Sequence, residues 1–109
     1  MPAPASTSPP ARRLIDNADD FGLSDSVNEA VIRAHRDGIL TTASLMTAEP
    51  AANNAVDLAR AHPKLGVGLH LSLLFGRSAL PRSEIPDLVD ADGRFSNSPV
   101  LSGARYFFK

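Results

Sequence analysis

The sequence contains neither cysteine nor tryptophan, and it has no excess of charge of either sign. The lack of cysteine excludes disulfides, thiolate metal sites and cysteine nucleophiles. Eleven basic and twelve acidic residues give a formal net charge of −1, so the charge does not indicate a nucleic-acid partner. No apolar run approaches the roughly 18 residues that a membrane span requires. We therefore expect a cytoplasmic protein that has no transmembrane segment and binds no nucleic acid.

The chain of 109 residues has room for one small domain. Residues 1–12 are rich in proline, alanine and serine, and we expect them to form a disordered extension. Residues 13–109 are expected to hold the folded part. A closed (β/α)₈ barrel needs about 250 residues and rarely fewer than about 200, so the length excludes a complete barrel.

Apolar and amphipathic segments alternate along the first two thirds of the chain. Strands are expected at 14–18, 39–48 and 65–74. Ser24 is expected to cap a first helix that ends at Gly38. Pro50 suits the first turn of a second helix, which Pro63 ends. The order strand, helix, strand, helix, strand predicts an α/β fold with parallel strands and right-handed crossovers.

The segment 65–74 alternates strictly between apolar and small or polar residues. We expect its apolar face to pack against helices; that face comprises Val67, Leu69, Leu71 and Leu73. The opposite face carries His70 among glycines and serines, and such an open polar space suits a metal ligand. The alternative is a one-sided sheet with His70 facing water. Late positions in the two helices indicate structural roles for His35 and His62.

The segment 76–103 is rich in proline, serine, glycine and aspartate, and we expect a long loop there. Asp92 and Gly93 indicate a small hairpin within it. Residues 104–109 are expected to begin another helix.

Asp19 and Asp20 place two adjacent carboxylates at the end of the first expected strand. Crowding two like charges is unfavourable unless a cation lies nearby. A divalent metal could take one carboxylate as a ligand, and the other could accept a proton from metal-bound water. A solvated acidic turn is the alternative. Because ligand sites in α/β folds lie at the carboxyl ends of parallel strands, an aspartate here and His70 could converge on one ion.

Three motifs, in order, resemble one family. They are Asn17–Ser24 (NADDFGLS), Asp37–Met46 (DGILTTASLM) and Gly66–Leu71 (GVGLHL). Together they resemble the YdjC-like carbohydrate deacetylases, which include the diacetylchitobiose deacetylases and a subgroup associated with hopanoid biosynthesis. Residues 87–95 resemble a loop of the hopanoid-associated subgroup less specifically.

The resemblance implies an irregular (β/α) barrel, of which this chain would be a truncated N-terminal portion. It implies a metal-dependent hydrolase that removes N-acetyl groups from amino sugars of chitooligosaccharide or glycolipid type. Asp19 would be the general base, and Asp20 and His70 would bind the divalent ion, Mg²⁺ or Zn²⁺. The metal would polarise the acetamide carbonyl and activate a bound water.

Two positions depart from the family pattern. Asp16 stands where the family usually has a branched apolar residue, and Arg33 and Arg36 are its candidate partners. The family's third metal ligand comes from a histidine-rich motif that this sequence does not contain. We therefore expect the isolated chain to bind metal very weakly and to have little or no activity. A non-catalytic carbohydrate-binding or interaction fragment, a chain with no stable fold and a homo-oligomer remain open alternatives.

Overall fold

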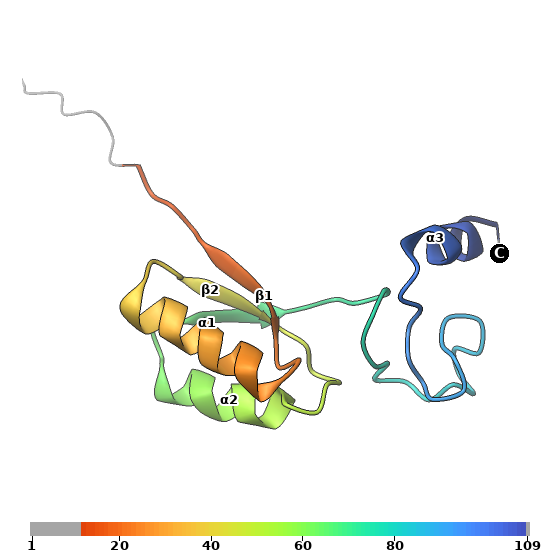
Figure 1. Cartoon of the computed structure of the whole chain (residues 1–109), viewed down its shortest axis with the longest axis horizontal. Helices are drawn as coiled ribbons and strands as arrows, with labels where there is room; N and C mark the ends of the chain where they lie inside the picture. Colours follow the sequence, from red (N-terminus) through yellow and green to blue (C-terminus); the bar gives the residue numbers. More distant parts are fainter. Residues whose placement is uncertain (1–11, 109) are drawn as a thin grey trace, which may run out of the picture.

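The computed structural model describes residues 12–108 and shows three parallel strands, two helices beside them and a third helix beyond (Figure 1). The elements are β1 (Asn17–Phe21), α1 (Asp25–Asp37), β2 (Thr42–Leu45), α2 (Ala52–Ala61), β3 (Gly66–Leu69) and α3 (Pro99–Phe108). The sheet order is β1-β2-β3, with both pairs parallel. The predicted α/β class and element order are confirmed. The predicted extension at 1–12 lies, except for residue 12, outside the described residues.

The two crossover helices form largely where the sequence predicts them. The Ser24 hydroxyl accepts the Val27 amide at 3.3 Å, and the Gly38 amide donates to a carbonyl of the last turn of α1. These contacts confirm both predicted ends of α1. Helix α2 ends at Ala61, before Pro63, as predicted, but it begins at Ala52. Pro50 therefore lies in the preceding turn, and its placement within the first helical turn was wrong.

All three strands differ from their predicted bounds. Strand β1 starts three residues late and runs through both aspartates, whereas the prediction ended it before them. Leu14 and Ile15 are exposed, so their apolar character marks no part of the sheet. Strands β2 and β3 have four residues each. The predicted strands at 39–48 and 65–74 were too long because pairing between the two covers only residues 42–45 and 66–69.

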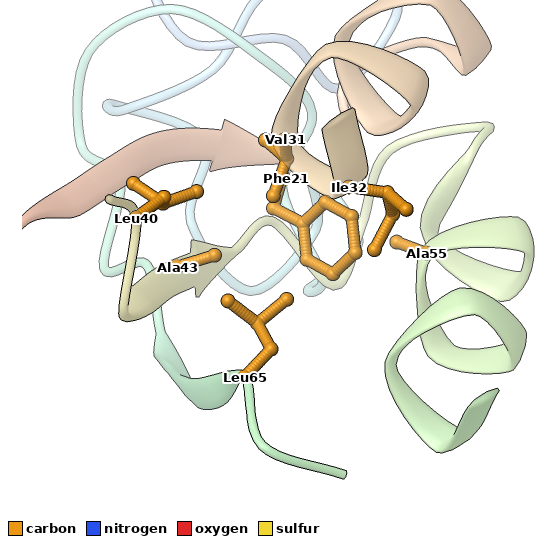
Figure 2. Close-up of a cluster of buried hydrophobic side chains, with 7 residues drawn as sticks. All are labelled: Phe21, Val31, Ile32, Leu40, Ala43, Ala55 and Leu65. Atoms are coloured by element: carbon orange, nitrogen blue, oxygen red, sulfur yellow. The ribbon is translucent and has the colours of Figure 1, made fainter. Parts of the chain in front are cut away.

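The core lies between the sheet and the two crossover helices. Its buried side chains are Phe21, Val31, Ile32, Leu40, Ala43, Ala55 and Leu65 (Figure 2). The Phe21 ring, from the end of β1, is fully buried in this cluster. Because burial of an aromatic side chain is among the larger contributions to stability, Phe21 anchors the strand end that carries the aspartates.

The apolar face of β3 is exposed. Val67 and Leu69 retain 41% and 61% of their accessible surface, and Leu71 and Leu73 are exposed as well. Strand β3 is at the edge of the described sheet, and an apolar groove of about 420 Å³ remains between it and α2. The prediction that this face packs against helices is therefore wrong for residues 12–108.

Beyond β3 the chain leaves the sheet and forms a separate lobe (Figure 1). The predicted turn at Asp92 and Gly93 is present, with Gly93 at a φ of +71° and the Asp90 carboxylate accepting the amides of Asp92 and Arg94. Helix α3 begins at Pro99, five residues earlier than predicted.

The missed signal for the start of α3 is the pair Ser98 and Pro99. The Ser98 hydroxyl accepts the Leu101 amide at 3.3 Å, which caps the helix. Proline suits the first helical position because its missing amide would be unpaired there in any case. No helix within residues 12–108 is long and apolar enough to cross a membrane.

Candidate metal centre

A bulge in β1 aims both aspartates at the same side of the sheet. Two residues separate Ala18 from Phe21, whereas only one separates their pairing partners on β2. Ala18 and Phe21 both pack on the core, so the residues between them, Asp19 and Asp20, are left to the opposite face. Regular alternation would have sent these two carboxylates to opposite faces. The backbone strain of the bulge lies at Asp20, whose φ is +61°.

Asp20 and His70 meet across the sheet. His70 follows β3, and its amide donates to the Leu45 carbonyl at the end of β2. Its Nδ1 accepts the Asp20 amide at 3.3 Å and lies 3.6 Å from Asp20 Oδ1. The His70 side chain is 25% exposed and the Asp20 side chain 49%. The structure thus brings together two predicted site residues that lie fifty positions apart.

Asp19 is held on the same face by its neighbours. The Asn17 side-chain amide donates to Asp19 Oδ1 at 3.0 Å and to the Ser44 hydroxyl of β2 at 3.2 Å. These contacts orient one oxygen of an exposed carboxylate. The sequence analysis gave no role to Asn17 or Ser44, although each lies within a family motif and Asn17 shares strand parity with Asp19.

The geometry of Asp20 and His70 fits two ligands of one divalent ion. Two donors with bonds of about 2.1 Å at a tetrahedral angle lie about 3.4 Å apart, close to the observed 3.6 Å. Nδ1 accepts the Asp20 amide with its single lone pair, so binding of an ion there would replace this hydrogen bond. Residues 12–108 hold no group of three candidate ligands. Among these residues, Asp20 and His70 are therefore a pair of candidate ligands without a third.

A pocket of about 330 Å³ lies beside His70. Its walls come from the loop after β2, from the chain after β3 and from the lobe of residues 77–95. The lining is mainly apolar, with Leu80, Ile85 and Phe95 contributed by the lobe. The pocket therefore adjoins the side chain that pairs with Asp20.

Asn28 secures the chain directly after the bulge. This fully buried residue of α1 accepts the Gly22 amide on Oδ1 at 2.7 Å. Its Nδ2 donates to the Ala51 carbonyl at 3.0 Å and to Asn54 Oδ1 at 2.9 Å. Gly22 has a φ of +101°, and a Cβ there would lie 2.9 Å from the Met46 carbonyl oxygen. The turn that ends β1 is thereby fixed to both crossover helices.

The remaining polar residues singled out by the sequence have structural contacts. His35 Nδ1 lies 2.8 Å from the Leu40 carbonyl, and His62 Nδ1 lies 2.8 Å from the Leu58 carbonyl. Both rings lie at the C-terminal ends of α1 and α2, away from Asp20 and His70, and they meet edge to face. These contacts agree with the predicted structural roles.

Asp16 does not take the partner that the sequence analysis suggested. Arg36 pairs with its neighbour Asp37 at 3.0 Å, and this hydrogen bond lowers the pKa of the Asp37 carboxyl. Within residues 12–108 no arginine forms an ion pair with Asp16. Its backbone is instead held by Thr41 and Thr42. The suggested pairing with Arg36 was wrong because a neighbouring carboxylate takes that guanidinium.

A sequence profile of the YdjC-like protein family matches residues 13–109. The chain belongs to this family. Carbohydrate deacetylases of Geobacillus stearothermophilus and Brevibacillus brevis are 45% and 47% identical over 95 and 83 residues, which are 86% and 76% of this chain. A carbohydrate deacetylase of Vibrio vulnificus is 44% identical over 84 residues, or 77% of this chain.

The matches cover 38%, 33% and 32% of those three relatives. This YdjC-like chain therefore spans about a third of the length of the curated relatives that it matches. A solved structure from Enterococcus faecalis V583, of a protein named for cellobiose-phosphate cleavage, superposes with a TM-score of 0.74 at 35% identity. The superposition covers 82% of this chain and 35% of that one. It supports the assignment of the three strands and two crossover helices to part of a larger α/β fold.

Proposed function

We propose that this YdjC-like chain carries the N-terminal part of a metal-dependent hydrolase that removes N-acetyl groups from acetylated amino sugars. The observation that carries the proposal is the approach of Asp20 and His70 to 3.6 Å at the carboxyl ends of parallel strands, with Asp19 on the same face. The carbohydrate deacetylases among its relatives support the reaction type.

Asp20 Oδ1 and His70 Nδ1 are the atoms that would hold the ion, Mg²⁺ or Zn²⁺. When bound, the ion supplies Lewis-acid polarisation of the acetamide carbonyl and acidifies a water. Asp19 is the proposed general base. Asn17 occupies its Oδ1, so Oδ2 remains to accept the proton of the attacking water.

The proton balance follows from these roles. The oxygen of the attacking water adds to the acetamide carbon while Asp19 takes one proton from that water. The C–N bond then breaks, the proton passes to the departing amine, and acetate and a free amino sugar leave. Hydrogen bonding by Asn17 keeps the Asp19 carboxylate directed at the reacting face throughout.

The isolated chain is expected to be a poor catalyst because two protein ligands bind a divalent ion weakly. The test is acetate release from an N-acetylated amino sugar, with and without Mg²⁺ or Zn²⁺, for the wild type and for His70→Ala. We expect little or no release from the chain alone. Robust turnover that survives both chelation and His70→Ala would contradict the assigned site.

The narrower assignments are also proposals. The proposed substrates are of chitooligosaccharide or glycolipid type, and the similarity of residues 87–95 to the hopanoid-associated subgroup supports the second type.

The second candidate is a non-catalytic carbohydrate-binding fragment of the same fold. The described residues favour it in one respect, since they contain no group of three candidate metal ligands. Sugar binding that is unchanged by a chelator and by Asp20→Ala would support this alternative. Binding that requires both metal and Asp20 would support the hydrolase.

A further inference from the structure

Glu49 is a buried carboxylate without a place in the proposed chemistry. It lies in the loop between β2 and α2 and is only 7% exposed. Glutamate is rarely buried unless its charge is hydrogen-bonded. Here Oε1 accepts the Arg77 amide at 2.5 Å, while the Glu49 carbonyl accepts the Ala52 amide at the start of α2. Glu49 thus links the start of α2 to the lobe that follows β3.

The backbone at Gly76 passes very close to the Glu49 carboxylate. Gly76 has a φ of +88°, which side-chain-bearing residues rarely adopt. A Cβ at Gly76 would lie 2.7 Å from Glu49 Oε1 and 3.0 Å from Met46 Cε. The close approach of the backbone to Glu49 therefore requires glycine at this position.

The segment around Arg77 is hydrogen-bonded to a second segment of the lobe, around Phe95. The Phe95 amide donates to the Gly76 carbonyl at 3.0 Å, and the Ser78 amide donates to the Gly93 carbonyl at 2.9 Å. These bonds pair the segments 75–78 and 93–96. Arg77 and Phe95 both line the pocket beside His70, so the link to Glu49 determines where that wall stands.

We propose that Glu49 is a positioning residue, whose buried carboxylate holds the Arg77 amide and so fixes segment 75–96 as the wall of the pocket beside His70. The wall in turn sets how an N-acetylated sugar fits next to Asp20 and His70. This second statement rests on the proposed function, whereas the first stands on the contacts alone.

The first experiment measures amide hydrogen exchange in the full chain. We expect Glu49→Ala to raise the exchange rates of the Arg77, Ser78 and Phe95 amides at least about tenfold, because a hydrogen bond to a charged group contributes about 1.5–3 kcal/mol. Glu49→Gln keeps an acceptor oxygen and should restore protection to near the wild-type level. Glu84→Ala, which removes an exposed carboxylate of the same lobe, is the matched control.

A second variant covers the case in which Glu49→Ala fails to fold. Gly76→Ala keeps the carboxylate but adds a Cβ 2.7 Å from Oε1 at a φ of +88°, so the Glu49 side chain or the backbone must shift, and the variant should release the same amides. The proposal is overturned if the Arg77 amide keeps its wild-type protection in either folded variant. It is equally overturned if Glu49→Gln loses protection to the same extent as Glu49→Ala.

The second experiment titrates N,N′-diacetylchitobiose while the His70 ring signals are followed by NMR. If the wild type binds the sugar, Glu49→Ala should lower the affinity for it about tenfold, and Glu49→Gln should restore that affinity. Equal sugar affinity in Glu49→Ala would overturn the link between wall and substrate. If the wild type binds no sugar while the exchange results hold, the proposed function fails and the positioning of the lobe by Glu49 stands.

Discussion

Replacing Asn28 by alanine should destabilise the chain more than any exposed substitution of similar size. The Asn28 side chain makes three hydrogen bonds, each with a net contribution of about 1 kcal/mol. For the Gly22 amide, which is left buried without its acceptor, the cost rises to about 1–3 kcal/mol. With about 1 kcal/mol for each of the two donated bonds, we expect a loss of about 3–5 kcal/mol in the free energy of unfolding.

Urea unfolding followed by circular dichroism measures this loss. Asn28→Asp keeps an acceptor for the Gly22 amide but turns a buried carboxylate oxygen toward the Ala51 carbonyl and Asn54 Oδ1, so its loss should be at least as large. Asn97→Ala is the control, because Asn97 is exposed and substitutions at such sites usually change stability by less than about 0.5 kcal/mol. A loss below about 1 kcal/mol for Asn28→Ala would refute the assignment of Asn28 as the clamp of the turn after β1.

Two further predictions test the fold around the site. Gly22→Ala should cost about 2 kcal/mol or more in unfolding free energy, because φ is +101° and the new Cβ would lie 2.9 Å from the Met46 carbonyl oxygen; an unchanged urea midpoint would argue against this turn geometry. Leu69→Lys should change stability by less than about 0.5 kcal/mol, because that side chain is 61% exposed, whereas a loss of several kcal/mol would mean that the face of β3 is covered in solution.

The sequence predicts those features that depend on local chemistry. The cap at Ser24 and the end of α1 at Gly38 follow from the preferences of single residues, and the structure reproduces both. The predicted approach of Asp20 to His70 relied on a general property of parallel sheets, which places strand ends at one edge. These predictions needed no knowledge of how side chains pack.

The features that were missed depend on tertiary contacts. Alternation alone would place Asp19 and Asp20 on opposite faces, and only the burial of both Ala18 and Phe21 shows that a bulge intervenes. The same limit applies to Glu49, whose partner amide is 28 residues away. Neither the extra residue in β1 nor this long-range hydrogen bond has a local sequence signature.

The prediction that the apolar face of β3 packs against helices was wrong for a different reason. Its alternation correctly indicates a strand with one apolar side, but alternation does not say which element covers that side. Among the described residues α2 leaves a groove there, so Val67 and Leu69 stay exposed. The matched segments cover only 38% and 33% of two curated relatives, and the strand patterning was interpreted as if all the packing partners lay within this chain.

If Asp20 and His70 together hold a divalent ion, paramagnetic Mn²⁺ bound there should broaden the NMR signals of the His70 ring. The chain has three histidines, so His35 and His62 serve as internal controls at the far ends of the helices. We predict that added Mn²⁺ broadens the His70 ring signals first and that Asp20→Asn largely removes the effect. Broadening of all three histidines alike, or the same His70 response in Asp20→Asn, would contradict the account.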